Sequence, residues 1–134
     1  MVSEAEQLGY HYIGISDHSQ AAHYANGLSP ERLHAQRAEV EAARLAHPSV
    51  LVLHGIECDI MGDGTLDLPD DCLASLDFVI ASVHTELAMD RDRMTARLVR
   101  AVSHPSVRVL GHPLGRRLLE HGLPVELRRL ALVE

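Results

Sequence analysis

Four side chains that can bind a metal ion each follow an apolar segment of this chain. The four side chains are His18, Glu57, His84 and His112. The apolar segments that precede them are residues 13–16, 50–53, 78–83 and 107–110. If these segments are buried strands, each one delivers a polar side chain near its carboxyl end. We therefore predict that the four side chains are ligands of a common metal site.

The ligand types indicate which ion the site would bind. Imidazole and carboxylate groups suit Mn²⁺ or Zn²⁺, with Mg²⁺ or Fe²⁺ as alternatives, better than Ca²⁺ or a thiolate-bound metal. A His/Glu/His set leaves coordination positions open, as a catalytic centre requires. A metal ion there can lower the pKa of a bound water and polarise a phosphoryl oxygen. Glu57 and His84 are the predicted catalytic residues, and Asp17 could orient an imidazole from behind the ligands.

Each of these residues also has an ordinary structural interpretation. Any one histidine at the end of a strand is more often hydrogen-bonded than bound to a metal, and Glu57 alone could be a solvated acid. The four together favour a metal site. Of the ten histidines, we assign five to the surface: His11, His34, His47, His104 and His121. The roles of His23 and His54 stay open.

Other catalytic chemistry has no support in the sequence. A glycine-rich phosphate loop, a Gly-x-Ser-x-Gly motif and a His-Glu-x-x-His motif are all absent. Arg116 is a candidate for binding a substrate phosphate, because arginine makes bidentate contacts with phosphate groups. The alternative is that Arg116 and its neighbour Arg117 are solvated.

Composition limits the class of protein. The chain has 134 residues and 46% hydrophobic residues, and we treat residues 1–134 as one domain. A net charge of −7 argues against broad binding to a phosphate backbone, unless a bound metal supplies positive charge locally. The sequence has no membrane-spanning run and no signal peptide, so we expect no membrane partner and a cytoplasmic location. Cys58 and Cys72 are expected to be reduced thiols.

Strands and helices alternate along the sequence. We predict strands at residues 11–16, 50–54, 77–83 and 107–110. We predict helices ending near Gly9, over residues 30–46, 69–76 and 91–102, and from about Pro124 onward, with Ser29 and Asp90 as N-caps. This order indicates an α/β fold with a parallel sheet, either open and doubly wound or closed as a barrel. In both cases functional groups collect at the carboxyl ends of the strands.

The motifs around the candidate ligands resemble those of the PHP (polymerase and histidinol phosphatase) family. The segments that carry the resemblance are residues 15–19, 55–60, 81–84 and 110–113. Within that family, three further segments are most similar to the PHP domain at the C-terminus of bacterial family X DNA polymerases: residues 26–32, 63–67 and 111–116.

The resemblance implies a distorted (β/α)7 barrel with up to three metal ions at its carboxyl-terminal face. It implies a metal-dependent phosphoesterase, associated in the polymerase-linked branch with Mn²⁺-dependent 3′–5′ exonuclease and DNA-end repair activity. By the same resemblance, Glu57 would bridge two ions, His84 and His112 would complete one of those sites, and His18 would bind a third ion. Glu57, His84 and His112 are therefore the set that we expect to share a metal.

The sequence lacks the opening His-x-His motif of the family and its late Asp-x-His motif. We therefore expect a partial barrel without its first and last strands, with the strand before His18 at an open edge. Three hypotheses follow. The chain processes DNA ends, with the polymerase domain of a parent chain as a possible partner; it hydrolyses small phosphate esters, as histidinol phosphatase does; or it is an inactive metal-binding fragment.

Overall fold

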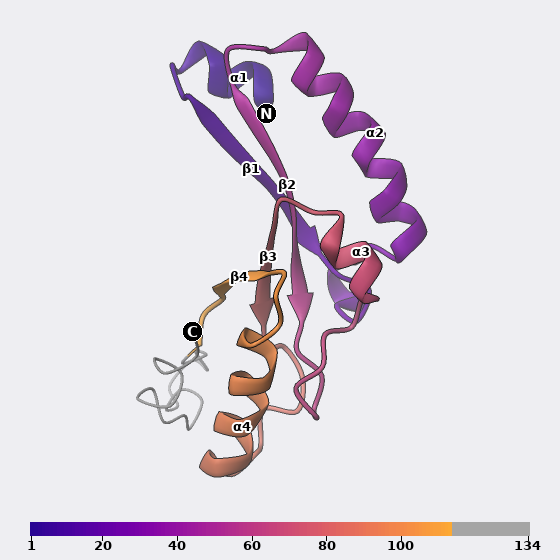
Figure 1. The fold of residues 1–134 in the computed structure, drawn as a ribbon, viewed down its shortest axis with the longest axis vertical. Helices are drawn as coiled ribbons and strands as arrows, with labels where there is room; N and C mark the ends of the chain where they lie inside the picture. Colours follow the sequence, from indigo (N-terminus) through magenta and orange to yellow (C-terminus); the bar gives the residue numbers. More distant parts are fainter. Residues whose placement is uncertain (114–134) are drawn as a thin grey trace.

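The computed structural model describes residues 1–113, which form a four-stranded parallel sheet with helices between the strands (Figure 1). The strands are β1 (Tyr12–His18), β2 (Leu51–Asp59), β3 (Phe78–Ser82) and β4 (Val107–Leu110). Their order in the sheet is the same as their order in the sequence. The predicted α/β fold with parallel pairing is confirmed. A strand order without reversal agrees with part of a β/α barrel, since a doubly wound sheet reverses direction at a switch point.

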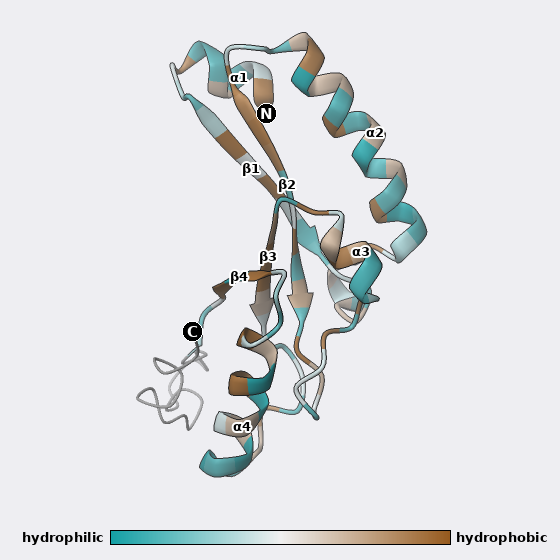
Figure 2. Cartoon of the chain, viewed as in Figure 1, coloured by the Kyte–Doolittle hydropathy of each residue, from teal (hydrophilic) through white to brown (hydrophobic). Residues whose placement is uncertain are grey.

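The two long helices begin and end where the sequence predicts, with Ser29 and Asp90 as caps, whereas the helix predicted over residues 69–76 is shorter and ends at Ala74. The helices are α1 (Val2–Gln7), α2 (Pro30–Ala46), α3 (Asp70–Ala74) and α4 (Arg91–Val102), with a short 3-10 helix η1 (His23–Ala25). Ser29 Oγ accepts a hydrogen bond from Arg32 N at 3.4 Å, and Asp90 Oδ1 accepts one from Arg93 N at 3.0 Å. Figure 2 shows that α2 is largely hydrophilic. The helix predicted from Pro124 lies outside the described residues.

Strand β2 is longer than predicted, and this changes where Glu57 lies. The expected end at His54 is wrong, since β2 continues to Asp59 and Glu57 lies inside it. Gly55 explains part of the continuation, because a Cβ at this position would lie 2.4 Å from the Phe78 ring of β3. Because Gly55 has no side chain, it can pair directly with Phe78 and the strand can continue. Successive residues of β2 then point to opposite faces of the sheet.

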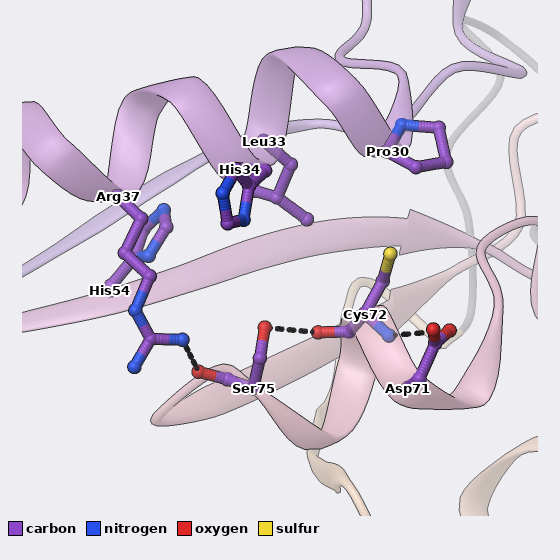
Figure 3. A pocket seen from close by; sticks show the side chains of 8 residues that line it. All are labelled: Pro30, Leu33, His34, Arg37, His54, Asp71, Cys72 and Ser75. Carbon is purple, nitrogen blue, oxygen red and sulfur yellow. Dashed lines mark hydrogen bonds between the residues drawn. The ribbon is translucent and has the colours of Figure 1, made fainter.

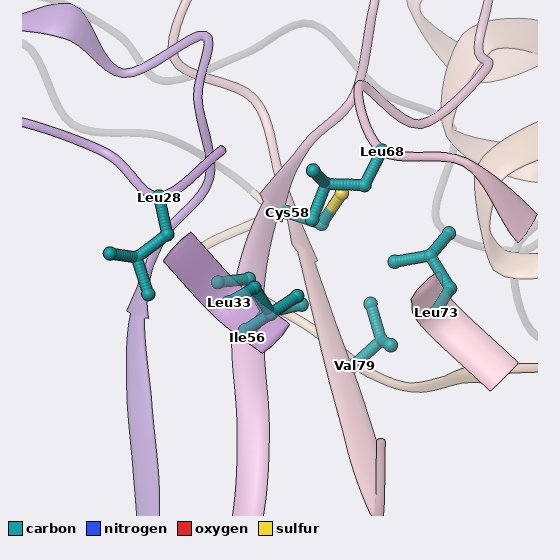
Figure 4. Close-up of a cluster of buried hydrophobic side chains, with 7 residues drawn as sticks. All are labelled: Leu28, Leu33, Ile56, Cys58, Leu68, Leu73 and Val79. Atoms are coloured by element: carbon teal, nitrogen blue, oxygen red, sulfur yellow. The ribbon is translucent and has the colours of Figure 1, made fainter. Parts of the chain in front are cut away.

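Helices cover one face of the sheet. A cluster on this face joins α2 and α3 to β2 and β3, and its members are Leu28, Leu33, Ile56, Cys58, Leu68, Leu73 and Val79 (Figure 4). A second cluster packs α4 against the sheet through Met94, Leu98 and Ala101, which lie on one face of the helix. Burial raises the pKa of the Cys58 thiol, which donates to Asp67 Oδ1 at 2.9 Å. Cys58 therefore lies on the face opposite to Glu57, as the alternation of the strand requires.

His54, whose role the sequence left open, is buried beneath α2. It lines a cavity of about 170 Å³ between α2 and α3, together with His34 and Cys72 (Figure 3). Its Nε2 lies 3.0 Å from Gln36 Oε1. Burial lowers the pKa of His54, and the positive charges of Arg37 and Arg44 act in the same direction, against Asp77 and Glu41. The structure thus favours a neutral His54.

We expect this burial to make stability depend on pH. An unfolded histidine titrates near pH 6.5. The pKa of His54 in the folded chain is lower than this. As the pH falls below about 6.5, His54 therefore binds a proton more readily in the unfolded chain than in the folded chain, and the folded state loses stability. Between pH 7 and 5, the free energy of unfolding should fall by up to about 1 kcal/mol more in the wild type than in His54→Gln. Urea unfolding at several pH values measures this difference. His34→Gln, at an exposed residue of the same cavity, should behave like the wild type; an equal pH dependence in all three proteins contradicts the prediction.

No helix among residues 1–113 is both long and apolar enough to cross a membrane.

Candidate metal centre

The carboxyl ends of the four strands bring the predicted ligands together. His18 is the last residue of β1 and is paired in register with Glu57 of β2. His84 and His112 each lie two residues beyond the end of a strand, β3 and β4 respectively. The imidazole of His84 lies between the other two, with ring centroids 5.0 Å from His18 and 5.1 Å from His112. The parallel register therefore turns four distant segments into one cluster.

Glu57 is the centre of this cluster. Its Oε2 lies 3.5 Å from His18 Nδ1, and its Oε1 lies 3.4 Å from His84 Nε2 and 3.2 Å from His112 Nε2. The hydroxyl of Ser82 donates to Oε1 at 2.7 Å. Burial by itself raises the pKa of Glu57, but the Ser82 hydroxyl and the three imidazoles together outweigh it and hold the pKa below its usual value. The cluster thus favours a carboxylate anion in its centre.

The geometry fits a divalent cation. Ligand atoms of His18, Glu57 and His84 all lie within 4.8 Å of one another, which is close enough to share one ion. His18 Nδ1 is buried, and within residues 1–113 it has no hydrogen-bond partner. Buried polar atoms rarely stay unpartnered, and a cation would satisfy this nitrogen. Two or three imidazoles with one carboxylate form the donor set of a site that keeps positions open for water or substrate.

The structure brings His18 into the compact group as well as His112. From the sequence, Glu57, His84 and His112 were expected to share a metal, and His18 was expected to stand apart. His112 does contact Glu57, but it is the more exposed of the histidines around the carboxylate. Its backbone φ is +28°, an uncommon value for a residue other than glycine. His18 is instead held inside the cluster.

Asp59 is a functional candidate that the sequence reasoning missed. It is 1% exposed, and its Oδ2 lies 3.1 Å from His84 Nδ1. A carboxylate at Nδ1 fixes a histidine with its Nε2 free to bind a metal, and His84 Nε2 is the atom that faces Glu57. The spacing of Glu57 and Asp59 was the available signal, because residues two apart on a strand point to the same face.

Tyr24 is a second neighbour of the cluster that the sequence reasoning missed. The ring of Tyr24 packs edge-on against two imidazoles of the cluster. Its ring centroid lies 5.8 Å from that of His18 and 6.3 Å from that of His84. Partial desolvation, followed by the charges of Asp59 and Glu57, raises the pKa of Tyr24, although this residue is 73% exposed.

Asp17 lies differently from the prediction that it orients an imidazole. Its Oδ2 accepts a hydrogen bond from Gln36 of α2 at 2.5 Å. Asp17 therefore ties β1 to α2, and its neighbour His18 points toward the cluster.

The cluster borders a polar cavity of about 420 Å³. His18 and Glu57 line one part of it, and Asn26 and Arg32 line another. Arg32 donates to the carbonyls of Asn26 and Gly27 at 3.0 and 3.1 Å, which holds its cationic side chain beside the cavity. The cavity therefore offers the permanent positive charge of Arg32 next to the candidate ligands, together with the carboxylate of Asp17. Arg116, the residue predicted to bind phosphate, lies outside the described residues.

The other described histidines do not join the cluster. His11, His23 and His34 are exposed. His47 and His104 were assigned to the surface, but they are half-buried and face Glu6 and Asp70 at 2.7 and 3.4 Å. His121 lies outside the described residues. Of the nine histidines in residues 1–113, only His18, His84 and His112 surround Glu57.

Known proteins similar to this chain are a DNA polymerase/3′-5′ exonuclease and several probable phosphatases. A DNA polymerase/3′-5′ exonuclease PolX of Bacillus subtilis is 43% identical over 116 residues, which cover 87% of this chain and 20% of that protein. A probable phosphatase of a Thermoanaerobacter species is 34% identical over 122 residues, which cover 82% of this chain and 44% of the phosphatase. A probable phosphatase of Caldanaerobacter subterraneus is 43% identical over 68 residues, 48% of this chain and 27% of that protein.

The chain thus spans about a fifth of the polymerase and less than half of these phosphatases. No family model matches the sequence. The similarity nevertheless runs through most of the chain and agrees with the parallel α/β fold and with the motifs recognised in the sequence. The chain belongs to the PHP family and is similar to a DNA polymerase/3′-5′ exonuclease PolX.

Proposed function

We propose that this chain carries the metal centre of a phosphoesterase that processes DNA 3′ ends, with Mn²⁺ or Zn²⁺ as its cofactor. The observation that carries the proposal is the position of Glu57, whose carboxylate is surrounded by three imidazoles at the carboxyl edge of a parallel sheet. The similarity to a PolX polymerase with 3′-5′ exonuclease activity favours a DNA substrate. Residues 1–134 are taken as a single domain of this kind.

His18, Glu57, His84 and His112 would hold the ion. A bound ion would polarise a phosphoryl oxygen and lower the pKa of water in an open position. Glu57 supplies the negative charge of the ligand set. With Asp59 Oδ2 at 3.1 Å from His84 Nδ1, a proton on Nδ1 would leave the lone pair of Nε2 for the ion. These residues thereby orient the centre before substrate arrives, which is how fixed charges lower a barrier.

Charge also bears on substrate binding. The chain has a net charge of −7, which opposes binding to a nucleic-acid backbone in general. Arg32 places a positive charge beside the cavity that borders His18 and Glu57. We infer that contact with phosphate is confined to this cavity and to the metal centre. Such local contact suits the end of a DNA strand better than a long duplex.

Hydrolysis of a small phosphate ester is the second candidate. The cavity of about 420 Å³ has the size of a small-molecule site, and two of the similar proteins are probable phosphatases. The same metal centre would serve this reaction, and only the group attached to the phosphate would differ. The substrates therefore have to be compared directly.

The test is cleavage of a 5′-labelled single-stranded oligonucleotide in the presence of Mn²⁺. A ladder of products shortened from the 3′ end is expected, together with its loss on addition of EDTA and in His84→Ala. His34→Ala, which removes an exposed histidine far from the centre, should retain the activity. Histidinol phosphate, assayed in parallel, separates the two candidates. Failure to cleave either substrate, or cleavage unchanged in His84→Ala, overturns the proposal.

A further inference from the structure

Arg97 is a buried cation whose described hydrogen bonds all go to backbone carbonyls. It lies on α4 and is 2% exposed. Its Nε donates to Met61 O at 2.8 Å, and one terminal nitrogen donates to Ile60 O. The other terminal nitrogen donates to Thr85 O at 3.1 Å and to Glu86 O at 3.3 Å. A buried arginine is uncommon unless such partners are present, so this arrangement calls for an explanation.

The four carbonyls belong to the two loops that leave the metal centre. Ile60 and Met61 directly follow Asp59, and Thr85 and Glu86 directly follow His84. Asp59 and His84 are the pair joined through Oδ2 and Nδ1 at 3.1 Å. One guanidinium therefore holds the chain immediately beyond both members of that pair. α4 lies next to these strand ends in Figure 1.

The loop after His84 packs on the core through Leu87 and Met89, but its backbone makes few hydrogen bonds. Within the part of the chain that the structure describes, no backbone-to-backbone hydrogen bond involves residues 84–89. Glu86 also has a positive φ of 51°. The hydrogen bonds from Arg97 to Thr85 O and Glu86 O therefore fix the backbone of this loop. An arginine suits this position because its planar fork can donate in several directions at once, whereas a lysine ammonium cannot match that geometry.

We infer that Arg97 is a positioning residue of the candidate metal centre. It holds the chain after Asp59 and the chain after His84 at a fixed separation, and it thereby sets the contact between the two side chains. This role rests on the proposed function, since it assumes that the cluster around Glu57 binds a metal. Arg97 itself lies behind that cluster and does not serve as a ligand.

The test is the Mn²⁺ affinity of Arg97→Lys, measured by electron paramagnetic resonance of free Mn²⁺. We expect an affinity about 10-fold weaker than in the wild type, as when a group supporting a ligand is lost, with an unchanged circular dichroism spectrum. Activity should recover at high Mn²⁺ concentration, because the centre is loosened and still present. A residue that only supports the fold gives no such recovery. Arg100→Lys is the matched control on the same helix, since Arg100 is exposed and donates to Asp63 O at 3.0 Å.

Arg97→Met provides a second variant if the lysine variant does not fold, since an apolar side chain of similar length is often tolerated in place of a buried charge. Affinities within about twofold of the wild type in a folded variant overturn the inference. Loss of the fold in both variants overturns it as well, because Arg97 is then required for folding in general. Absence of Mn²⁺ binding by the wild type overturns the proposed function itself, and this inference with it.

Discussion

Replacing Glu57 with glutamine is expected to abolish tight metal binding and with it the proposed phosphoesterase activity. Glutamine keeps the size of the side chain but removes the charge that faces His18, His84 and His112. The lowered pKa of Glu57 shows that its surroundings stabilise the anion. We expect the affinity for Mn²⁺ to fall by more than about 100-fold, beyond the loss typical of a group that only supports a ligand. Isothermal titration with Mn²⁺ measures this change.

The control for this experiment is Glu41→Gln. Glu41 lies on α2, is exposed, and pairs with Arg44 at 2.7 Å far from the cluster. The same chemical change there should leave metal affinity as it is in the wild type. Apo forms of all three proteins should have the same helix content by circular dichroism, so that a loss of binding is not a loss of folding. Retention of Mn²⁺ affinity within about threefold in Glu57→Gln would show that this carboxylate is not a ligand.

The elements of the fold could be predicted largely from short-range signals. Ser29 and Asp90 predict the starts of the two long helices, because a side-chain oxygen before a helix accepts a hydrogen bond from a free backbone N–H of its first turn. Gly9 ends α1 because it adopts a positive φ of 76°, with Tyr10 N bonded to Ala5 O as in a Schellman turn. These signals involve neighbours within a few residues, so they can be seen without knowing the tertiary structure.

The end of β2 could not be predicted from the same signals. Residues 55–59 combine a glycine and two acids with buried apolar residues, a composition that by itself indicates a loop. They form a strand because β1 and β3 pair with them on either side. The pairing requires that residue 55 has no side chain, because the ring of Phe78 occupies the space that such a side chain would need. Only the tertiary structure shows this contact.

The candidate site also has residues that could be predicted from the sequence and residues that could not. The candidate ligands His18, Glu57, His84 and His112 could be named from their places after apolar segments, because parallel strands end at a common edge. Their partners could not. Asp59 and Ser82 look like ordinary strand residues until the register places them beside His84 and Glu57. Asp17 shows the converse, since being next to His18 in sequence puts it on the opposite face of the strand.

Asp59 therefore leads to the second major prediction, that Asp59→Asn weakens metal binding without weakening the fold. Oδ2 of the buried Asp59 lies 3.1 Å from His84 Nδ1, and within residues 1–113 Asp59 Oδ1 has no hydrogen-bond partner. An asparagine can still accept from His84 through its amide oxygen, but it lacks the charge that holds the proton on Nδ1. The affinity for Mn²⁺ should fall by about 10- to 100-fold, the usual effect of altering a group that orients a ligand.

Stability should change in the opposite direction or not at all. Burying an ionised carboxylate is unfavourable unless its partners compensate, and the neutral amide avoids this penalty. The free energy of unfolding of the apo protein, measured in urea, should therefore be at least equal to that of the wild type. Asp63→Asn is the matched control, because Asp63 is exposed in the turn that follows β2. A variant that loses stability and metal affinity together would indicate that Asp59 supports the fold, whereas a loss of affinity alone identifies it as the residue that orients His84 for the metal.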